Sequence, residues 1–111
     1  MGAASRIADE VSRWEGVTTH PHRFGGVEFR LGKRELGHLH GDRLADIPFP
    51  TSVRDELVAA GRAHPHHVLP DSGWISRWIE QDEDAGEVVE LFRLSYERAL
   101  AARDRAGTHS S

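Results

Sequence analysis

Two alternating segments joined by a two-residue turn constrain the fold most strongly. In residues 27–31, Val27, Phe29 and Leu31 alternate with charged side chains, which is the period of a strand with one buried face. Gly32-Lys33 follows, and a Gly-X pair between two alternating segments is a common hairpin connection. The sequence therefore predicts an antiparallel hairpin whose second strand occupies residues 35–40.

The second strand of this hairpin carries two histidines on one face. Strict alternation separates its side chains into Leu36, His38 and His40 on one face and Glu35, Gly37 and Leu39 on the other. Gly41-Asp42 forms the next turn, and residues 44–47 return as a further strand that ends at residues 48–50. Consecutive strands joined by tight turns predict a meander.

Helices and further strands flank the meander. Residues 4–15 have apolar side chains at helical spacing and predict an amphipathic helix whose Trp14 docks on the sheet. Residues 17–24 predict an edge strand that Pro21 interrupts. We also expect a helix from Thr51 capped by Ser52, a strand at residues 74–79, and a long helix over residues 84–103 that begins at Asp84. The last helix turns one stripe inward: Val88, Leu91, Phe92, Ser95, Tyr96 and Ala99.

These elements predict an α+β domain. It comprises an antiparallel sheet, a meander of about four to six short strands, and three helices, with the long C-terminal helix packed on the sheet. A chain of 111 residues has room for one hydrophobic core, so we expect one domain over residues 1–111. Its core spans about residues 4–103 and a frayed tail follows at 104–111. A homodimer is compatible with this size.

Composition excludes several classes of protein. The chain lacks cysteine, which rules out disulfides and thiolate metal sites. It has no apolar run of membrane-spanning length and no signal-peptide core, so we expect a soluble, cytoplasmic protein without membrane contact. A formal net charge of −4 argues against nucleic acid as a partner. The chain is histidine-rich, and protonation of all eight histidines would change the net charge from −4 to +4. The favoured interpretation is that most of them are exposed and titrate normally.

His38 and His40 are the leading candidates for function. On one strand face they project roughly 6.5–7 Å apart along the backbone, so both rings can converge on one ion or anion. Imidazole is a common ligand of transition metals, and Asp42 or Asp71 could supply a carboxylate. Three interpretations stay open: a divalent metal or catalytic cluster, histidines that hydrogen-bond within the fold or line a polar cleft, and plain solvent exposure. The second is favoured.

The other histidines are weaker candidates. His20 and His22 flank Pro21, which is expected to bend their strand. His66 and His67 are adjacent, so an extended backbone would point them to opposite faces and let only one join a shared site.

The segment before the predicted strand at residues 74–79 supplies two more candidates. Ser72 lies beside Asp71 and histidines, but there is no Gly-x-Ser-x-Gly motif, so a backbone-capping turn serine is favoured over a catalytic triad. Trp74 could form the wall of a ligand cleft with its indole N–H as a donor, although a core position is favoured.

Three motifs resemble a known family. The strings GHLHGD (37–42), HHVLPDSGW (66–74) and LFRLSYE (91–97) resemble, in this order, a small bacterial and fungal domain called the luciferase domain. The resemblance covers residues 16–100. It implies an α+β domain with helices on one side of an antiparallel sheet, and it implies little about chemistry. The tryptophan-bearing strand, acidic turn and Ser-Tyr helix also resemble MmcQ/YjbR double-wing proteins in element order.

The sequence specifies no reaction, and two functions stay open. The first is binding of a small ligand in one cleft lined by His38, His40, His67, Asp71 and Trp74, with a divalent metal at His38 and His40 as a narrower version. The second is a non-catalytic module that binds protein or nucleic acid through the sheet or the basic hairpin around Arg30, opposed by the acidic run 80–90. The first requires His38 and His40 to meet the segment 66–74.

Overall fold

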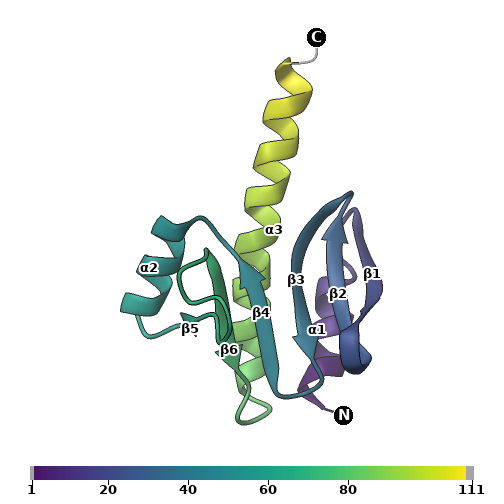
Figure 1. Cartoon of the computed structure of the whole chain (residues 1–111). Coiled ribbons are helices and arrows are strands. Elements are labelled where there is room, and N and C mark those ends of the chain that lie inside the picture. Colours follow the sequence, from purple (N-terminus) through teal and green to yellow (C-terminus); the bar gives the residue numbers. More distant parts are fainter. Residues whose placement is uncertain (1, 110–111) are drawn as a thin grey trace.

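Six strands form one antiparallel sheet in the computed structural model, which describes residues 2–109 (Figure 1). The strands are β1 (Val17–His22), β2 (Gly26–Leu31), β3 (Arg34–His40), β4 (Leu44–Pro48), β5 (His64–Pro65) and β6 (Trp74–Trp78). Their order across the sheet is β1-β2-β3-β4-β6-β5, so the first four strands are the predicted meander. Strand β6 pairs with β4, and β5 pairs with the outer edge of β6.

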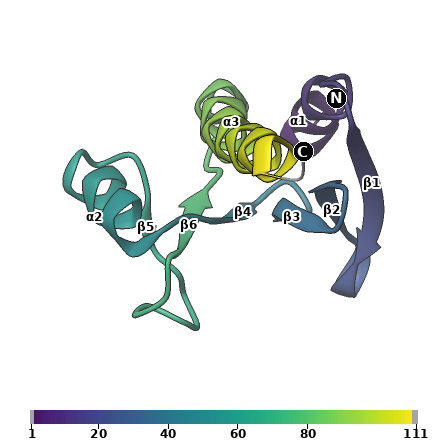
Figure 2. The same cartoon turned by 90° about the horizontal axis from the view of Figure 1, so that it is seen from above.

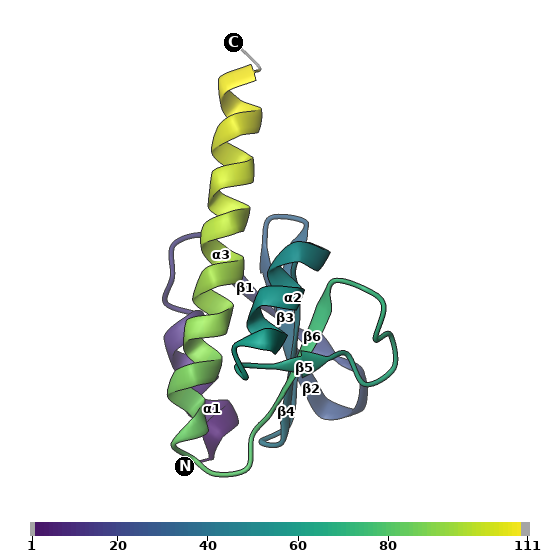
Figure 3. The same cartoon turned by 90° about the vertical axis from the view of Figure 1, so that its left-hand side faces the viewer.

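Two of the three helices cover one face of the sheet. Helices α1 (Ala3–Val11) and α3 (Asp84–His109) lie side by side on this face, and α2 (Thr51–Ala59) lies at the β5 end (Figure 2). The loop between β5 and β6 lies on the opposite face, as Figure 3 shows from the side. The structure therefore confirms the α+β class and the long helix on the sheet. No helix among residues 2–109 has the length and apolar character needed to cross a bilayer.

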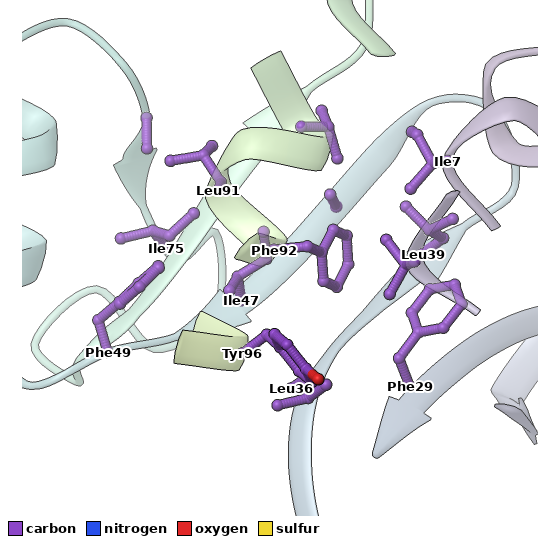
Figure 4. Close-up of a cluster of buried hydrophobic side chains, with 14 of the residues drawn as sticks. Ile7, Phe29, Leu36, Leu39, Ile47, Phe49, Ile75, Leu91, Phe92 and Tyr96 are labelled. Carbon is purple, nitrogen blue, oxygen red and sulfur yellow. The ribbon is translucent and has the colours of Figure 1, made fainter. Parts of the chain in front are cut away.

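The inward stripe of α3 packs as predicted. Leu91 and Phe92 are buried against the sheet, where the Phe92 ring meets Phe29 edge to face at 5.3 Å between centroids (Figure 4). Leu39 of β3 and Ile47 of β4 belong to the same buried cluster, on the face of the sheet that α3 covers. Since side chains alternate along a strand, the neighbours of these residues point to the face away from α1 and α3.

A β-bulge in β3 overturns the predicted division of its side chains. Phe29 pairs with Gly37 and Arg30 with Glu35, which leaves Leu36 as the extra residue. Leu36 is therefore buried in the core below α3 rather than beside the histidines, and its carbonyl accepts a 2.9 Å hydrogen bond from Ser95 Oγ. The same shift moves Glu35 onto the histidine face. The expected grouping of Leu36 with His38 and His40 was wrong because strict alternation ignores the extra residue.

The N-terminal elements differ from expectation in two places. Strand β1 is an edge strand, as predicted, but it continues through Pro21, which pairs with Val27. A proline is tolerated there because the outer side of an edge strand needs no amide donor. Helix α1 ends at Val11, before its predicted end at residue 15, and Trp14 packs on Tyr96 of α3 with ring centroids 5.2 Å apart.

The other two helices begin at the predicted residues, Thr51 and Asp84, but the cap of α2 and the end of α3 differ from expectation. Pro50 occupies the N-cap of α2, which begins at Thr51, so Ser52 lies inside the helix and makes no capping bond. Asp84 closes the turn before α3 by accepting the amides of Glu80 (2.9 Å) and Gln81 (3.2 Å). Helix α3 continues past its predicted end at residue 103 to His109, and residues 110–111 of the expected tail lie outside the described range.

Candidate functional site

A row of polar side chains crosses the sheet on the face away from α1 and α3. The strand registers place Glu28, His38, Asp46 and Ser76 side by side on β2, β3, β4 and β6. All four are buried. Burying a carboxylate or an imidazole costs free energy unless the group is paired. This polar row is therefore the candidate functional site of the sheet.

Asp46 is the centre of the site. Its side chain is 1% exposed, and its Oδ2 lies 2.9 Å from His40 Nε2 and 3.2 Å from His67 Nε2. The Nε2 atoms of His38 and His66 each lie 3.4 Å from the same oxygen. Four imidazole nitrogens therefore converge on one carboxylate oxygen.

Hydrogen bonding keeps Asp46 ionised. Burial alone would raise the pKa of this carboxyl, but hydrogen bonds from His38 and Ser76 and the charge of His66 hold it well below its usual range. The Ser76 hydroxyl donates to Asp46 Oδ1 at 2.7 Å and so fixes the rotation of the carboxylate. The site thus has a permanent buried negative charge that faces imidazoles.

His38 is held between two carboxylates. Its Nδ1 lies 2.6 Å from Glu35 Oε2, a contact that exists because the bulge turns Glu35 onto this face. Burial alone would lower the pKa of His38, but hydrogen bonds to Asp46 and Glu35 outweigh that effect and raise it to about 9. A histidine whose Nδ1–H donates to a carboxylate presents its Nε2 to a ligand in a fixed orientation.

His22 joins the cluster from the edge strand. Its ring stacks on His38 with centroids 3.9 Å apart, and its Nδ1 lies 3.1 Å from Glu28 Oε1. Gly26 lies opposite His22, and a Cβ there would approach the Leu39 carbonyl to 2.5 Å. Glycine at this position therefore avoids a clash with the backbone of β3.

Arg30 also contacts Glu28, so one cation of the basic hairpin belongs to the site. Burial would raise the pKa of Glu28, but hydrogen bonds from Arg30 and His22 lower it. His20, two residues before His22, is outside this group: its Nε2 hydrogen-bonds to the hydroxyl oxygen of Thr18 at 2.8 Å.

Both histidines of the β5–β6 loop reach the centre, contrary to expectation. The backbone bends after Pro65, so the rings of His66 and His67 stack at 4.5 Å instead of pointing to opposite faces. His66 Nδ1 accepts the amides of Val68 (3.1 Å) and Leu69 (3.0 Å), which places the proton of its neutral form on Nε2. Burial, with the charges of His67 and His38, lowers the pKa of His66. His66 therefore holds the loop and donates towards Asp46.

The remaining candidates divide between the site and the surface. Trp74 contacts the His38 ring at 5.4 Å and is only partly buried, so it borders the site. Asp71 is exposed, and among the described residues it makes no hydrogen bond or ion pair with the cluster. Asp42 accepts the amide of Ala4 (2.8 Å), which removes it as a ligand candidate. Ser72 donates to the Leu69 carbonyl at 2.7 Å and is a turn serine, as predicted.

A hollow of about 380 Å³ adjoins the histidines. Its lining consists of Arg34, Glu35, Pro48, Phe49, Pro50 and Trp74. Glu35 and Trp74 both contact His38, so the hollow lies directly beside the cluster. Its volume is within the range of small-molecule sites.

Asp46 is the principal functional residue that sequence reasoning missed. The signal was present in the predicted hairpin. The short turn pairs His40 with Leu44, and in an antiparallel pair the position two residues before His40 lies opposite the position two residues after Leu44, so His38 pairs with Asp46. A charged residue between Ala45 and Ile47 of a predicted central strand is itself unusual. Glu35 was also missed, because the bulge left no trace in the alternation, and Glu28 was not considered as a site residue. His22 was given less weight because Pro21 was expected to bend its strand, whereas β1 continues through Pro21.

Two overlapping sets of donors satisfy metal-ligand spacing. Within each set the donor atoms lie within 4.8 Å of one another: His22, His38 and His40 in one, and His40, Asp46 and His67 in the other. Two ligands of a tetrahedral zinc ion, each about 2.0–2.1 Å from the metal, lie about 3.3–3.4 Å apart. His67 Nε2 lies 3.2 Å from Asp46 Oδ2, close to that spacing, and His40 Nε2 lies nearer, at the hydrogen-bond distance of 2.9 Å.

Residues 33–95 match the family model described as the luciferase domain, which is more than half of the chain. The match includes the bulged strand, Asp46 and the β5–β6 loop. No curated protein matches the chain significantly. No solved structure does so either. The second resemblance, to MmcQ/YjbR proteins, stays a prediction.

Proposed function

The chain belongs to the luciferase-domain family, and we propose that it binds a divalent transition-metal ion and, beside it, a small ligand. The ion would be held by His40, Asp46 and His67. Two imidazoles and one carboxylate are the donors of some catalytic zinc sites and of non-haem iron sites, and both leave coordination positions open.

The crowding around Asp46 carries this proposal. A carboxylate oxygen offers about two lone-pair positions, yet four imidazole nitrogens lie within 3.4 Å of Oδ2. Hydrogen bonding can satisfy some of these nitrogens, and a cation between them accounts for the others. His66 is excluded as a ligand because its Nδ1 accepts two amides and its Nε2 keeps the proton.

The hollow beside His38 supports the second half of the proposal. Trp74 and Phe49 give it aromatic walls, and Arg34 adds a positive charge at its edge. A small molecule placed there lies next to the cluster, where an open position of the ion can meet it. Of the cleft residues expected from the sequence, Trp74 lines this hollow, whereas His38, His40, His67 and Asp71 do not.

Metal binding is tested on the untagged chain, since a histidine tag would add ligands. The protein is stripped with a chelator, titrated with Zn²⁺, Co²⁺ and Fe²⁺, and analysed for bound metal. We expect an ion bound at micromolar concentration or tighter that the native chain and the His20→Ala variant hold and the Asp46→Asn variant loses. Absence of bound metal at micromolar concentration, or equal binding by Asp46→Asn, contradicts the proposal.

The ligand is sought by thermal-shift screening of small organic acids and neutral metabolites, with and without the bound ion. A specific ligand raises the melting temperature of the native chain and does so less in Trp74→Ala. A shift that is equal in both proteins places the ligand elsewhere.

A further inference from the structure

Resting on the proposed metal site, we propose that the centre holds two ions and that His22, His38 and His40 bind the second. His40 serves both ions. The first ion uses His40, Asp46 and His67, which leaves His22 and His38 without a role in it. Their donor atoms nevertheless lie within 4.8 Å of each other and of one on His40.

The orientation of His22 and His38 supports this assignment. Each ring has its Nδ1 at a carboxylate, Glu28 for His22 (3.1 Å) and Glu35 for His38 (2.6 Å). Metal-binding histidines characteristically donate their second nitrogen to such a carboxylate, which fixes the tautomer and leaves Nε2 for the metal. Both histidines therefore carry the outer hydrogen bonds of metal ligands.

The position of His40 explains how one ring can serve two ions. His22 lies on β1 and His67 hydrogen-bonds to Ser76 of β6, so the two lie towards opposite edges of the sheet from β3. The plane of the His40 ring is steeply inclined to both other rings, at 73° to His22 and 89° to His67, with centroids 5.8 Å and 6.2 Å away. An imidazole that binds ions through both nitrogens gives up its N–H proton to solvent.

Charge balance predicts that the second ion binds more weakly. Asp46, Glu28 and Glu35 are negative and Arg30 is positive, which makes a net charge of −2 that the first divalent ion neutralises. The second ion makes the centre positive even after His40 loses a proton. An anionic ligand in the neighbouring hollow would offset that charge, so small anions should strengthen the second step.

The test is the number of ions per chain. The untagged, chelator-stripped protein is titrated with Co²⁺, and bound cobalt is followed by absorption and by elemental analysis after dialysis. We expect two steps in the native chain, one in His22→Ala, one in His67→Ala, and two in the matched control His20→Ala. Added phosphate should tighten the second step of the native chain.

Each outcome separates this inference from the proposed function. A native chain that binds one ion, with His22→Ala still binding one, overturns the second site and leaves the first intact. A native chain that binds none overturns both. Should a variant fail to fold, the stoichiometry of the native chain alone decides, because one bound cobalt per chain at saturation excludes two ions. Electron paramagnetic resonance of the Cu²⁺-loaded chain gives a further check, since two nearby ions couple and one does not.

Discussion

Replacing Gly37 by alanine tests how closely α3 approaches the β-bulge of β3, which places Glu35 beside His38. Gly37 has a φ of +146°, a conformation that side chains rarely adopt. A Cβ at this position would lie 2.7 Å from Phe92 Cε1 and 2.8 Å from the Asp46 carbonyl oxygen. The substitution therefore adds backbone strain and a steric clash at the same residue.

The magnitude follows from these two parts. A residue held in a sparsely populated backbone conformation costs about 1–3 kcal/mol. Overpacking a filled core costs about 1–3 kcal/mol more. Gly32→Ala is the matched control, because Gly32 also has a positive φ (+63°) but nothing lies within 4 Å of its Cβ position. We expect it to lose roughly 1–2 kcal/mol from the backbone alone.

Urea unfolding followed by tryptophan fluorescence measures both losses. Gly37→Ala should lose about 2 kcal/mol more than Gly32→Ala, a large part of the ~5–15 kcal/mol by which a domain is stable. Losses equal within about 0.5 kcal/mol would refute the argument that the close approach of Phe92 and Asp46 requires glycine.

Two further predictions concern a helix cap and a titration. Asp42→Ala removes the acceptor of the Ala4 amide and should lower the free energy of unfolding by about 1 kcal/mol. Metal binding should not change, and a loss of bound ion in this variant would contradict the placement of Asp42 outside the site. In the metal-free protein the pKa of His38 is raised from about 6.5 to about 9, so its stabilising effect is complete below pH ~6.5 and disappears as the pH rises through ~9. Urea unfolding in chelator should then show a loss of up to about 3 kcal/mol between pH 6 and pH 9.5, and a His38→Gln variant should lack this loss. Stability that is constant or rising over this interval contradicts it.

Local patterns predicted the framework because each depends on a few neighbouring residues. The period of residues 27–31 and the Gly32-Lys33 turn specify a hairpin without reference to the rest of the chain. The stripe along α3 likewise depends only on helical spacing, and its members Leu91, Phe92 and Tyr96 are buried as expected. The fold class, a sheet with α3 packed on it, follows from these elements.

The parts that failed depend on a single inserted residue or on distant contacts. Leu36 and Glu35 changed faces because the bulge adds one residue to β3, and no pattern within the strand marks it. His67 reaches Asp46 through a bend after Pro65, and the two are far apart in the sequence. Three expected ligands, His38, His40 and His67, do meet, whereas Asp71 does not. The meeting of His38, His40 and His67 could be expected from their residue types, but identifying Asp46 as the residue between them required the pairing register of β3 and β4.

The row of site residues across the sheet would couple the proposed metal binding to folding. His22 and His67 come from opposite sides of the meander, so the complete centre exists only after every strand between them has paired. The first proposed ion would join β3 and β4 to the β5–β6 loop, and the second would join the edge strand β1 to β3. At a free concentration 100 times its dissociation constant, either ion would add about 2.7 kcal/mol to the stability of the whole domain. Hydrogen exchange of amides throughout the sheet, and not only beside the histidines, should then slow on loading with metal.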